Sequence, residues 1–518
     1  MSDSEIKKPF DIWEKLEAII KKRESIILIF IVLLAFAYIP GKIFSYGWVP
    51  YDDALRHVAF SMIDAKWSDV VAIEENLESD HNPGWHYILK FLYKHCGFDK
   101  SDLTFFSFAG LFFIFNLCGI LVSSPISWCL ALVIMANIDT SFGIRVLLGR
   151  PYVFSCAVTL ILLHIWNVRS EKDEEAWFRK GWVKYFISIV ALVLATWIHG
   201  SWYLFLLLPA SFFLAGKTKI AFIQAALVFL STIIGAGLSG DFCGFMYFHF
   251  VATFQIFNES IPNWMLVDEL ACGQQYISWA VYVAILAILC NIKGKFHFKD
   301  IGKDPVFIMI LLCWLCGIAT ARFWLDWGIV ALLLWMSYRI DDLICSSVFL
   351  KSPRIKYCLT SFVIVTMVLC FANDRDGRFS KDAKYQAIDF FSEAAQENLK
   401  GWEPQPGGIV YSPHMGVFYQ HFYEYPNAQW KYILGFESAI MPLEDRKIFR
   451  NIMYNYNDRM PEIFLPWINK MTEKDRIIMN HIPGYFPQME WKRANLRYWI
   501  GRLKVASDTV ELKDSKTK

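Results

Sequence analysis

The sequence predicts a polytopic α-helical membrane protein that carries a small domain outside the membrane at its C-terminal end. Of the 518 residues, 55% are hydrophobic and 17% are aromatic, and the mean hydropathy is +0.34. One soluble core would not use so many apolar residues. The formal net charge is only +2, so the charge balance gives no indication of nucleic acid as a partner.

Eleven mostly apolar stretches are about long enough to cross a bilayer core that is roughly 30 Å thick. The predicted transmembrane domain, residues 24–372, follows a charged cytoplasmic segment, residues 1–23. Its predicted spans are residues 24–43, 103–121, 124–137, 151–167, 184–198, 202–215, 219–238, 277–292, 305–320, 324–341 and 357–372. We expect the first span to remain as an anchor, because no small-residue cleavage site precedes Lys42.

Basic residues indicate how the chain crosses the membrane. Six lysines and arginines precede the first span, and further basic clusters follow the fourth, sixth, eighth and tenth spans. Residues 240–276, between the seventh and eighth spans, contain no lysine or arginine. Because basic loops stay in the cytoplasm, the N-terminus is predicted inside and the C-terminus outside. The two long outer loops are then residues 44–102 and 239–276.

The apolar run 242–257 in the second of these loops is predicted to be a lateral helix in the outer membrane interface. A twelfth span at this place would move the basic residues between Lys293 and Lys303 to the outer side.

After residue 372 the composition becomes polar and mixed, which marks a second domain over residues 373–518. Gly407 and Gly408 predict a turn before a short strand, and residues 384–400 and 443–456 have helical spacing. This domain is therefore predicted to be a small extracytoplasmic α/β domain.

Charged residues and histidines gather at the outer ends of the predicted spans. Charge beside a membrane domain costs free energy without helping the fold, so it indicates function. Asp52 and Asp53 begin a segment, Asp52 to Val71, whose apolar spacing predicts an amphipathic interfacial helix with Asp52 as its N-cap. The full set is Asp52, Asp53, Arg56, His57, Asp80, His81, Arg145, Arg150, His199 and Arg322.

This layout and two short motifs resemble the GT-C superfamily of integral-membrane glycosyltransferases, which use polyprenyl- or dolichyl-linked sugars. Those proteins have eleven to thirteen spans, a long first outer loop with an acidic residue soon after the first span, and often a C-terminal domain outside. The stretch from Asp80 to Leu89 is similar to the His-Pro-Pro-containing stretch of protein O-mannosyltransferases and lipid A aminoarabinose transferases, with Asn82 in place of the first proline. Gly149-Arg150-Pro151 gives weaker support.

The residue types suit transfer from a lipid phosphate, in which an acceptor loses a proton while a phosphate leaves with negative charge. Asp52 or Asp53 is the candidate base. Arginine donates two hydrogen bonds to phosphate, so the predicted phosphate-binding residues are Arg56, Arg145, Arg150 and Arg322. The predicted polar partners of the substrate are His57, Asp80, His81 and His199. Asp52, Asp80 and His81 could also supply ligands to a divalent cation.

The resemblance implies a glycosyltransferase that moves a sugar, with inversion, from a polyprenyl phosphate carrier to a glycan, lipid or protein acceptor. We expect a bacterial inner membrane protein whose site faces the periplasm. Two alternatives are a polymerase or ligase of lipid-linked cell-surface glycans and a membrane transporter. A polymerase would concentrate its chemistry in a large middle outer loop. A transporter would carry ionisable residues in the middle of several spans and internal repeats.

Overall fold

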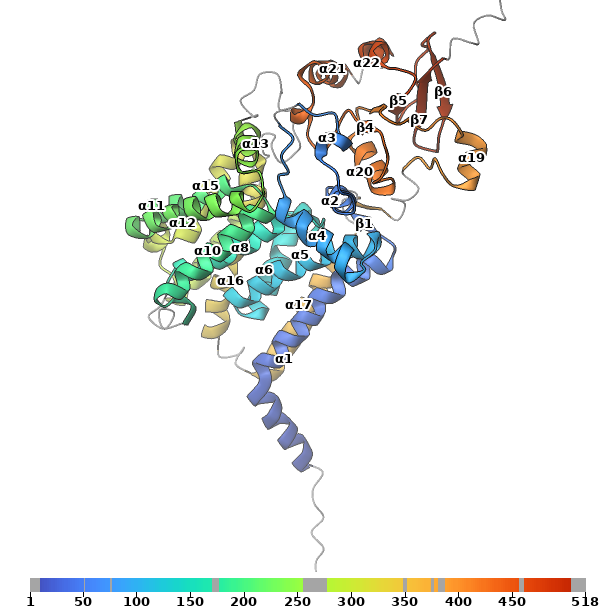
Figure 1. Cartoon of the computed structure of the whole chain (residues 1–518). Helices are drawn as coiled ribbons and strands as arrows, with labels where there is room; N and C mark the ends of the chain where they lie inside the picture. Colours follow the sequence, from blue (N-terminus) through green and yellow to red (C-terminus); the bar gives the residue numbers. More distant parts are fainter. Residues whose placement is uncertain are drawn as a thin grey trace, which may run out of the picture.

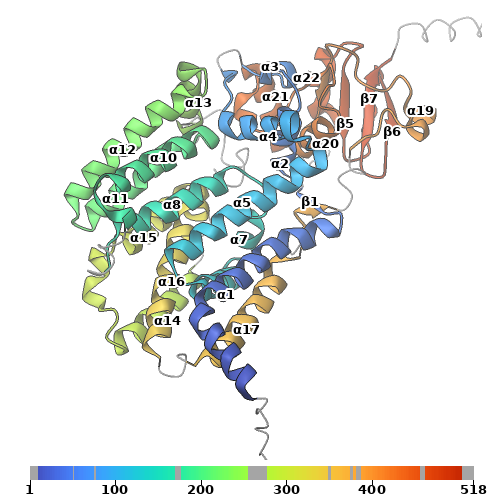
Figure 2. The same cartoon turned by 60° about the horizontal axis from the view of Figure 1, so that its bottom comes forward.

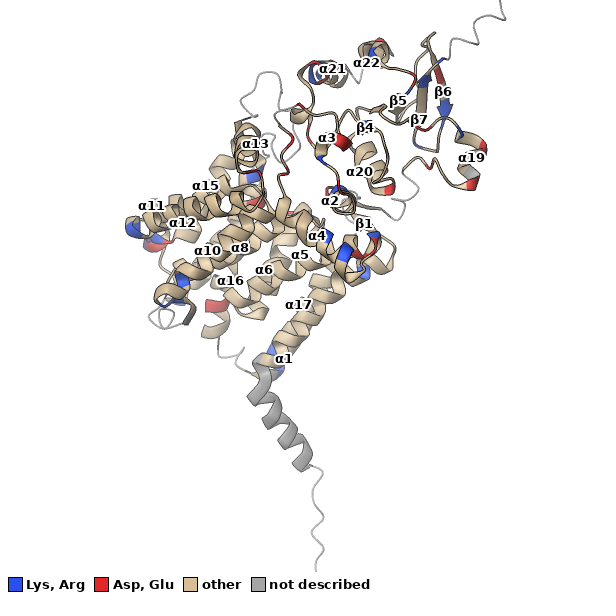
Figure 3. Ribbon diagram, viewed as in Figure 1, with Lys and Arg blue, Asp and Glu red and all other residues tan. Residues whose placement is uncertain are grey.

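The computed structural model describes residues 10–50, 52–74, 77–169, 177–254, 277–347, 352–373, 377–380, 387–455 and 461–504. A bundle of helices makes up most of the chain, and a mixed sheet lies beyond one end of the bundle (Figure 1). The N-terminal end of α1 lies at the opposite side of the bundle from that sheet. Charged residues lie mainly at the ends of the bundle helices and in the C-terminal part of the chain (Figure 3).

Each of the eleven predicted spans is a helix in the structure. They are α1 (Phe10–Ser45), α5 (Lys100–Val122), α6 (Pro125–Ile138), α8 (Tyr152–Trp166), α10 (Gly181–Ile198), η3 with α11 (Trp202–Leu206 and Leu207–Leu214), α12 (Thr218–Gly237), α14 (Ser278–Ile292), α15 (Pro305–Ala319), η7 with α16 (Phe323–Gly328 and Ile329–Ser346) and α17 (Pro353–Phe371). Among the described residues, five stretches are long and apolar enough to cross a membrane, and several others form shorter apolar helices. The five are Ile26–Ser45, Lys100–Val122, Gly181–Ile198, Thr218–Gly237 and Arg354–Phe371. The chain is therefore an integral membrane protein.

Local sequence explains where several of these helices begin. The Asp99 carboxylate accepts a hydrogen bond from the backbone N–H of Asp102 at the start of α5, and Asp102 accepts one from Asp99 in return. Ser124 and Asp304 cap α6 and α15 in the same way, and each precedes a proline at the first helical position. Such caps satisfy backbone N–H groups that have no partner within the helix.

The first outer loop folds into short elements instead of one long interfacial helix. Its elements are β1 (Val49–Pro50), α2 (Ala54–Ser61), α3 (Trp67–Val70) and α4 (Pro83–Cys96). The predicted helix from Asp52 to Val71 was wrong in its length, because the chain turns after α2 and Trp67 stacks on Phe60 with ring centroids 4.0 Å apart. Asp52 lies before the helix, and the side chain of Asp53, the residue that precedes Ala54, does not cap it.

A helix is present at the position of the predicted lateral helix as α13 (Phe242–Phe254), and the remainder of that run, residues 255–257, lies outside the described residues. The other short elements of the transmembrane domain are α7 (Thr140–Arg145), η2 (Trp177–Arg179) and η6 (Phe298–Lys303).

The C-terminal domain contains a five-stranded sheet in the order β4-β3-β5-β7-β6. Strands β3 (Ile409–Tyr411), β4 (Lys431–Tyr432) and β5 (Arg476–Met479) are parallel, while β6 (Met489–Arg493) and β7 (Trp499–Leu503) form an antiparallel hairpin whose β7 also pairs with β5. The helical elements are α19 (Glu393–Leu399), α20 (Met415–Glu424), η9 (Ser438–Ile440), α21 (Leu443–Tyr454), η11 (Pro461–Phe464) and α22 (Leu465–Lys470). The expected strand after Gly408 and the expected α/β composition are confirmed.

The first outer loop and the C-terminal domain are joined by backbone pairing on two sides. β1 pairs in antiparallel fashion with β2 (Phe379–Ser380), which follows the last span. Val71 forms an isolated parallel bridge with Tyr432 of β4, and the N–H of Ala72 donates to the carbonyl of Tyr432. The loop helices α2, α3 and α4 accordingly lie between the bundle and the sheet (Figure 2).

Candidate functional site

A cavity of about 140 Å³ lies where the first outer loop, the end of the helix bundle and the C-terminal domain meet. Seven of the ten predicted site residues line it. They are Asp53, Arg56, His57, His81, Arg150, His199 and Arg322. These side chains come from α2 and the residue before it, from the loops before α4 and α8, and from the chain that follows α10 and α15. The structure therefore brings together residues that are up to 269 positions apart, between Asp53 and Arg322.

Several lining residues were not predicted from the sequence. His249 comes from α13, Tyr419 from α20 and Glu437 from the segment just before η9. Asn82 and Ser201 also line the cavity beside predicted histidines. The sequence contains no pattern that predicts α13 or the C-terminal domain to lie near the first outer loop. The lining residues from these elements could therefore be identified only from the fold.

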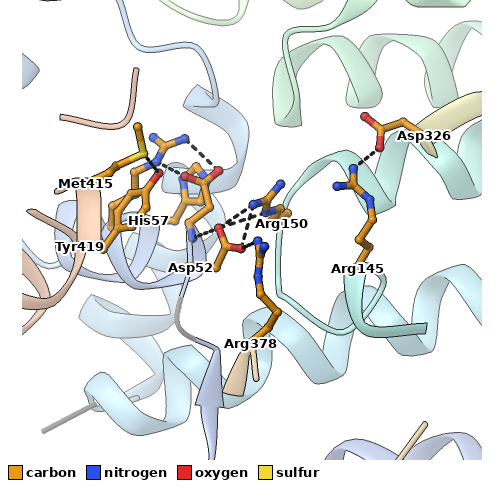
Figure 4. A network of polar contacts seen from close by, with 10 residues as sticks. Asp52, His57, Arg145, Arg150, Asp326, Arg378, Met415 and Tyr419 are labelled. Carbon is orange, nitrogen blue, oxygen red and sulfur yellow. Dashed lines mark hydrogen bonds and ion pairs between the residues drawn. The ribbon is translucent and has the colours of Figure 1, made fainter. Parts of the chain in front are cut away.

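Asp52 lies beside the cavity in an ion-pair network and is not one of its lining residues (Figure 4). Its carboxylate is 5% exposed and accepts hydrogen bonds from Arg150, with Nη2 at 2.7 Å from Oδ1 and 2.8 Å from Oδ2. Arg378, which directly precedes β2, donates to the same carboxylate. Asp52 thus connects the first outer loop, the chain before α8 and the start of the C-terminal domain.

A glycine turn places Arg150 against Asp52. Gly149 has φ +69°, a left-handed conformation in which a side chain is strained. A Cβ atom there would be 3.1 Å from both the Cβ of Ala54 and the backbone nitrogen of Phe108. The tripeptide Gly149-Arg150-Pro151 therefore combines a backbone turn, close packing against α2 and α5, and a cation at the cavity wall.

Asp53 lines the cavity and is paired with Arg56 one turn further along the chain. Arg56 Nε donates to Asp53 Oδ1, and Nη2 donates to Oδ2 at 3.1 Å. Burial alone would raise the pKa of the Asp53 carboxyl, but the charge of Arg56 and the nearby His57 hold it well below its usual range. Asp53 is therefore ionised at neutral pH, and 22% of its side chain is exposed.

A second ion-pair network lies on the other side of the cavity and is built on a π-helical turn. Asp326 in η7 is buried, and its carboxylate accepts hydrogen bonds from Arg145 at 2.5 Å and from Arg322 at 3.3 Å. Only Arg322 of these three lines the cavity. Arg145 therefore contacts the site through Asp326, which differs from the direct contact with substrate that the sequence predicted (Figure 4). Single turns of π-helix occur often at functional sites.

His57 begins a chain of hydrogen bonds that leads to Asp80. His57 Nδ1 is 2.7 Å from Nε2 of His86, and His86 Nδ1 is 2.6 Å from Oδ2 of Asp80. Burial and the charge of Arg56 lower the pKa of His57 to about 3. Burial would raise the pKa of Asp80, but its contact with His86 lowers it. Asp80 does not line the cavity, and it contacts the site through His86 and through the backbone N–H of Asn82. His86 was not predicted.

The remaining histidines of the site are fixed by packing. His81 stacks on Phe248 of α13 at a centroid distance of 4.2 Å, and His199 Nδ1 lies 3.2 Å from the hydroxyl oxygen of Ser155. Burial and the charge of Arg56 lower the pKa of His81 well below its usual range. Gly200 allows His249 to approach, because a Cβ atom at Gly200 would lie 1.8 Å from Nε2 of His249.

The possible metal site is not supported by the geometry. Asp52 is held by two arginines and Asp80 by His86. Within the part of the chain that the structure describes, no three histidine, cysteine, aspartate or glutamate side chains lie together as a metal-binding group. Asp52, Asp80 and His81 therefore do not form one set of ligands.

The wall of the cavity carries three arginines, Arg56, Arg150 and Arg322, and two carboxylates, Asp53 and Glu437. The charged side chains of the wall thus have an excess of one positive charge.

Comparison of the chain with models of known protein families and with the sequences of curated proteins found no match in either.

Proposed function

We propose that this protein is a GT-C-like membrane glycosyltransferase that moves a glycosyl group from a polyprenyl phosphate carrier to an acceptor. The observation that carries the proposal is the cavity at the end of the helix bundle, which combines three arginines with an ionised aspartate. A lipid-linked donor needs a cationic cavity at the end of the membrane bundle, because its lipid stays in the bilayer while its phosphate binds to positively charged side chains. The eleven-span arrangement with the N-terminus inside, and a site facing the periplasm of a bacterial inner membrane, belong to the same proposal.

Arg150 and Arg322 are the proposed partners of the donor phosphate. Each lines the cavity, and each is oriented by a buried aspartate, Asp52 for Arg150 and Asp326 for Arg322. Guanidinium groups that are already held in place stabilise the negative charge of a departing phosphate without reorganising during the reaction. The excess of one positive charge in the wall also suits a phosphodiester, which carries one negative charge.

Asp53 is the proposed base, in preference to Asp52. Of these two aspartates only Asp53 lines the cavity, whereas Asp52 accepts hydrogen bonds from two arginines. An acceptor hydroxyl that binds beside Asp53 would attack the anomeric carbon as the phosphate leaves from the opposite side. A single displacement of this kind inverts the stereochemistry and needs no second carboxylate as a nucleophile.

The test is transfer of radiolabelled sugar from a panel of polyprenyl phosphate donors to membrane acceptors by the full-length protein. We expect transfer by the wild type and a loss of about 100-fold or more in Asp53→Asn. Asp64→Asn is the matched control, because Asp64 lies in the same loop, is 69% exposed and pairs only with Lys90 and Lys94 among the described residues. No transfer by the wild type with any donor would contradict the proposal and favour a glycan polymerase, a ligase or a transporter.

A further inference from the structure

Four side chains of the first outer loop form one continuous line that begins at the cavity. The line runs from Asp53 Oδ2 to His57 Nε2, from His57 Nδ1 to His86 Nε2, and from His86 Nδ1 to Asp80 Oδ2. The three distances are 3.6, 2.7 and 2.6 Å. Asp53 and Asp80 at the two ends are 22% and 25% exposed, whereas His57 is fully buried and His86 is 7% exposed.

The distances indicate one arrangement of the imidazole protons. With one N–H proton on each imidazole, two protons are available for three gaps. The short gaps of 2.7 and 2.6 Å are hydrogen bonds, so His57 Nδ1–H donates to His86 and His86 Nδ1–H donates to Asp80. The lone pair of His57 Nε2 then faces Asp53 Oδ2 across 3.6 Å, and this nitrogen has no hydrogen-bond partner among the described residues. The third gap therefore lacks a proton.

We propose that Asp53, His57, His86 and Asp80 act as one proton-accepting chain for the acceptor of glycosyl transfer. This inference rests on the proposed function and assigns to it two positioning residues, His86 and Asp80. In the step, the acceptor O–H bond breaks and its oxygen forms a bond to the anomeric carbon. The bond from that carbon to the phosphate oxygen breaks, and its electron pair leaves with the polyprenyl phosphate. The proton passes by way of Asp53 to His57 Nε2.

The loaded chain is a short-lived intermediate in which the added proton fills the one gap that lacked a hydrogen bond. Its positive charge is shared by two imidazoles that lie between two carboxylates, as charge-assisted hydrogen bonds require. The chain returns to its resting state when the extra proton passes to water at one of the partly exposed carboxylates. Arg56 keeps the pKa of Asp53 low, and burial with the charge of Arg56 lowers that of His57 to about 3, so neither group retains the proton.

The surroundings of these four side chains favour proton transfer from one to the next. His86 lies against Phe60 and Trp67, with ring centroids 4.9 and 6.0 Å away. These aromatic rings shield the middle of the chain from water. Other charged or titratable groups that face it are Arg56 from α2, His81 from the loop before α4, His199 after α10 and Tyr419 from α20.

The test uses His86→Gln and Asp80→Asn in the full-length protein. Glutamine at position 86 can still accept the hydrogen bond from His57, and asparagine at position 80 can still accept the one from His86, but neither can hold the proton. We expect kcat to fall about 10-fold or more in each variant, as for the loss of general acid–base assistance. The KM for the donor should stay within about twofold, and the solvent deuterium isotope effect on kcat should increase because proton transfer becomes slower. His95→Gln, an exposed histidine on the same helix α4, is the matched control.

If both variants keep the kcat and the isotope effect of the wild type, the proposed proton-accepting chain is contradicted, while the proposed glycosyl transfer is not. A rise in KM with unchanged isotope effect would also overturn the chain, because that result indicates a purely structural role. If His86→Gln does not fold, Asp80→Asn decides the question, since its partly exposed side chain is easier to replace. No transfer by the wild type would instead overturn the proposed function and, with it, this inference.

Discussion

Asp52 and Asp53 are adjacent in sequence, but their carboxylates face different arginines and only that of Asp53 lines the cavity. Asp52 is buried between Arg150 and Arg378, and Asp53 lines the cavity beside Arg56. From the sequence alone both were candidate bases, because the spacing gives no distinction between a carboxylate that meets the substrate and one that orients an arginine. The distinction depends on Arg378, which lies 326 residues away from Asp52.

We predict that Asp52→Asn destabilises the protein. The asparagine would leave two guanidinium groups beside a neutral amide. Removing one partner of a fully buried pair costs about 3–5 kcal/mol, but Arg378 is 40% exposed, so we expect about 2 kcal/mol. The measurement is the apparent melting temperature in detergent, and Asp64→Asn, which breaks a surface pair, should change it little. Equal melting temperatures for Asp52→Asn and wild type would contradict this role.

The stability of the C-terminal domain should depend on pH through His421. His421 is buried in α20, and its Nε2 accepts the backbone N–H of Ile388 at 2.7 Å. Burial lowers the pKa of His421 from 6.5 to about 3. Between these two values the unfolded chain binds a proton that the folded protein does not, so the free energy of unfolding falls as the pH falls from 6.5 towards 3.

The expected loss from His421 alone is about 2 kcal/mol between pH 6.5 and pH 5. His421→Gln should reduce this pH dependence, because a glutamine oxygen can accept the same hydrogen bond but does not titrate. Melting temperatures at pH 6.5 and pH 5 measure the effect, with the exposed His95→Gln as the control. The same decrease in His421→Gln as in the wild type would assign the pH dependence to other groups.

At the scale of elements, the turn before α8 determines the position of Arg150. Gly149 and Gly97 both have left-handed backbones, with φ +69° and φ +72°. They differ in their surroundings. A Cβ at Gly149 would meet α2 and α5 at 3.1 Å, whereas at Gly97 nothing lies within 4 Å among the described residues.

We therefore predict that Gly149→Ala has a larger effect than Gly97→Ala. Both variants should lose about 1 kcal/mol of stability, because alanine is strained in this conformation. Only Gly149→Ala must also move Arg150 relative to Asp52, so its affinity for the polyprenyl phosphate donor should fall several-fold. Donor binding and melting temperature, measured on both variants, separate the two effects. Equal donor affinities would show that the turn does not position Arg150.

Several elements could be predicted from the sequence because their signals are local. Apolar runs identified the five long and the several shorter apolar helices that the structure describes, and the glycine turn at Gly407 and Gly408 identified strand β3. The break between α2 and α3 was not predictable, because it depends on the stacking of Trp67 on Phe60. His86 was missed for a similar reason, since a histidine within α4 has no local signal and its partners, His57 and Asp80, are defined only by the fold.

At the scale of the whole molecule, the C-terminal domain is part of the site and not an appendage. One hydrophobic cluster joins Trp67, Val71 and other residues of the first outer loop to Phe422 and Phe436 of the C-terminal domain. Arg446 of α21 also pairs with Glu74 of the loop at 3.1 Å. Because the cavity lies between these parts, its shape requires that the domain stays docked.

The residue that best tests this docking is Trp67, which is 2% exposed and contacts both parts. Its ring centroid lies 4.0 Å from that of Phe60 in the loop and 4.9 Å from that of Phe436 in the domain. Trp67→Ala should cost about 3–5 kcal/mol, the usual effect of removing a buried tryptophan. Since the lost contacts are at the interface, we expect the C-terminal domain to become sensitive to protease while the bundle helices stay protected.

Limited proteolysis of the full-length protein in detergent, followed by identification of the cleavage sites, measures this change. Tyr485→Ala is the control, because Tyr485 belongs to the same domain but is 86% exposed. If Trp67→Ala leaves the protease resistance of the domain unchanged, the other contacts hold the domain without it, among them β1–β2, the Val71–Tyr432 bridge and the Arg446–Glu74 pair. If it instead exposes the domain and abolishes sugar transfer together, the cavity depends on docking of the domain, because Trp67 itself does not line the cavity.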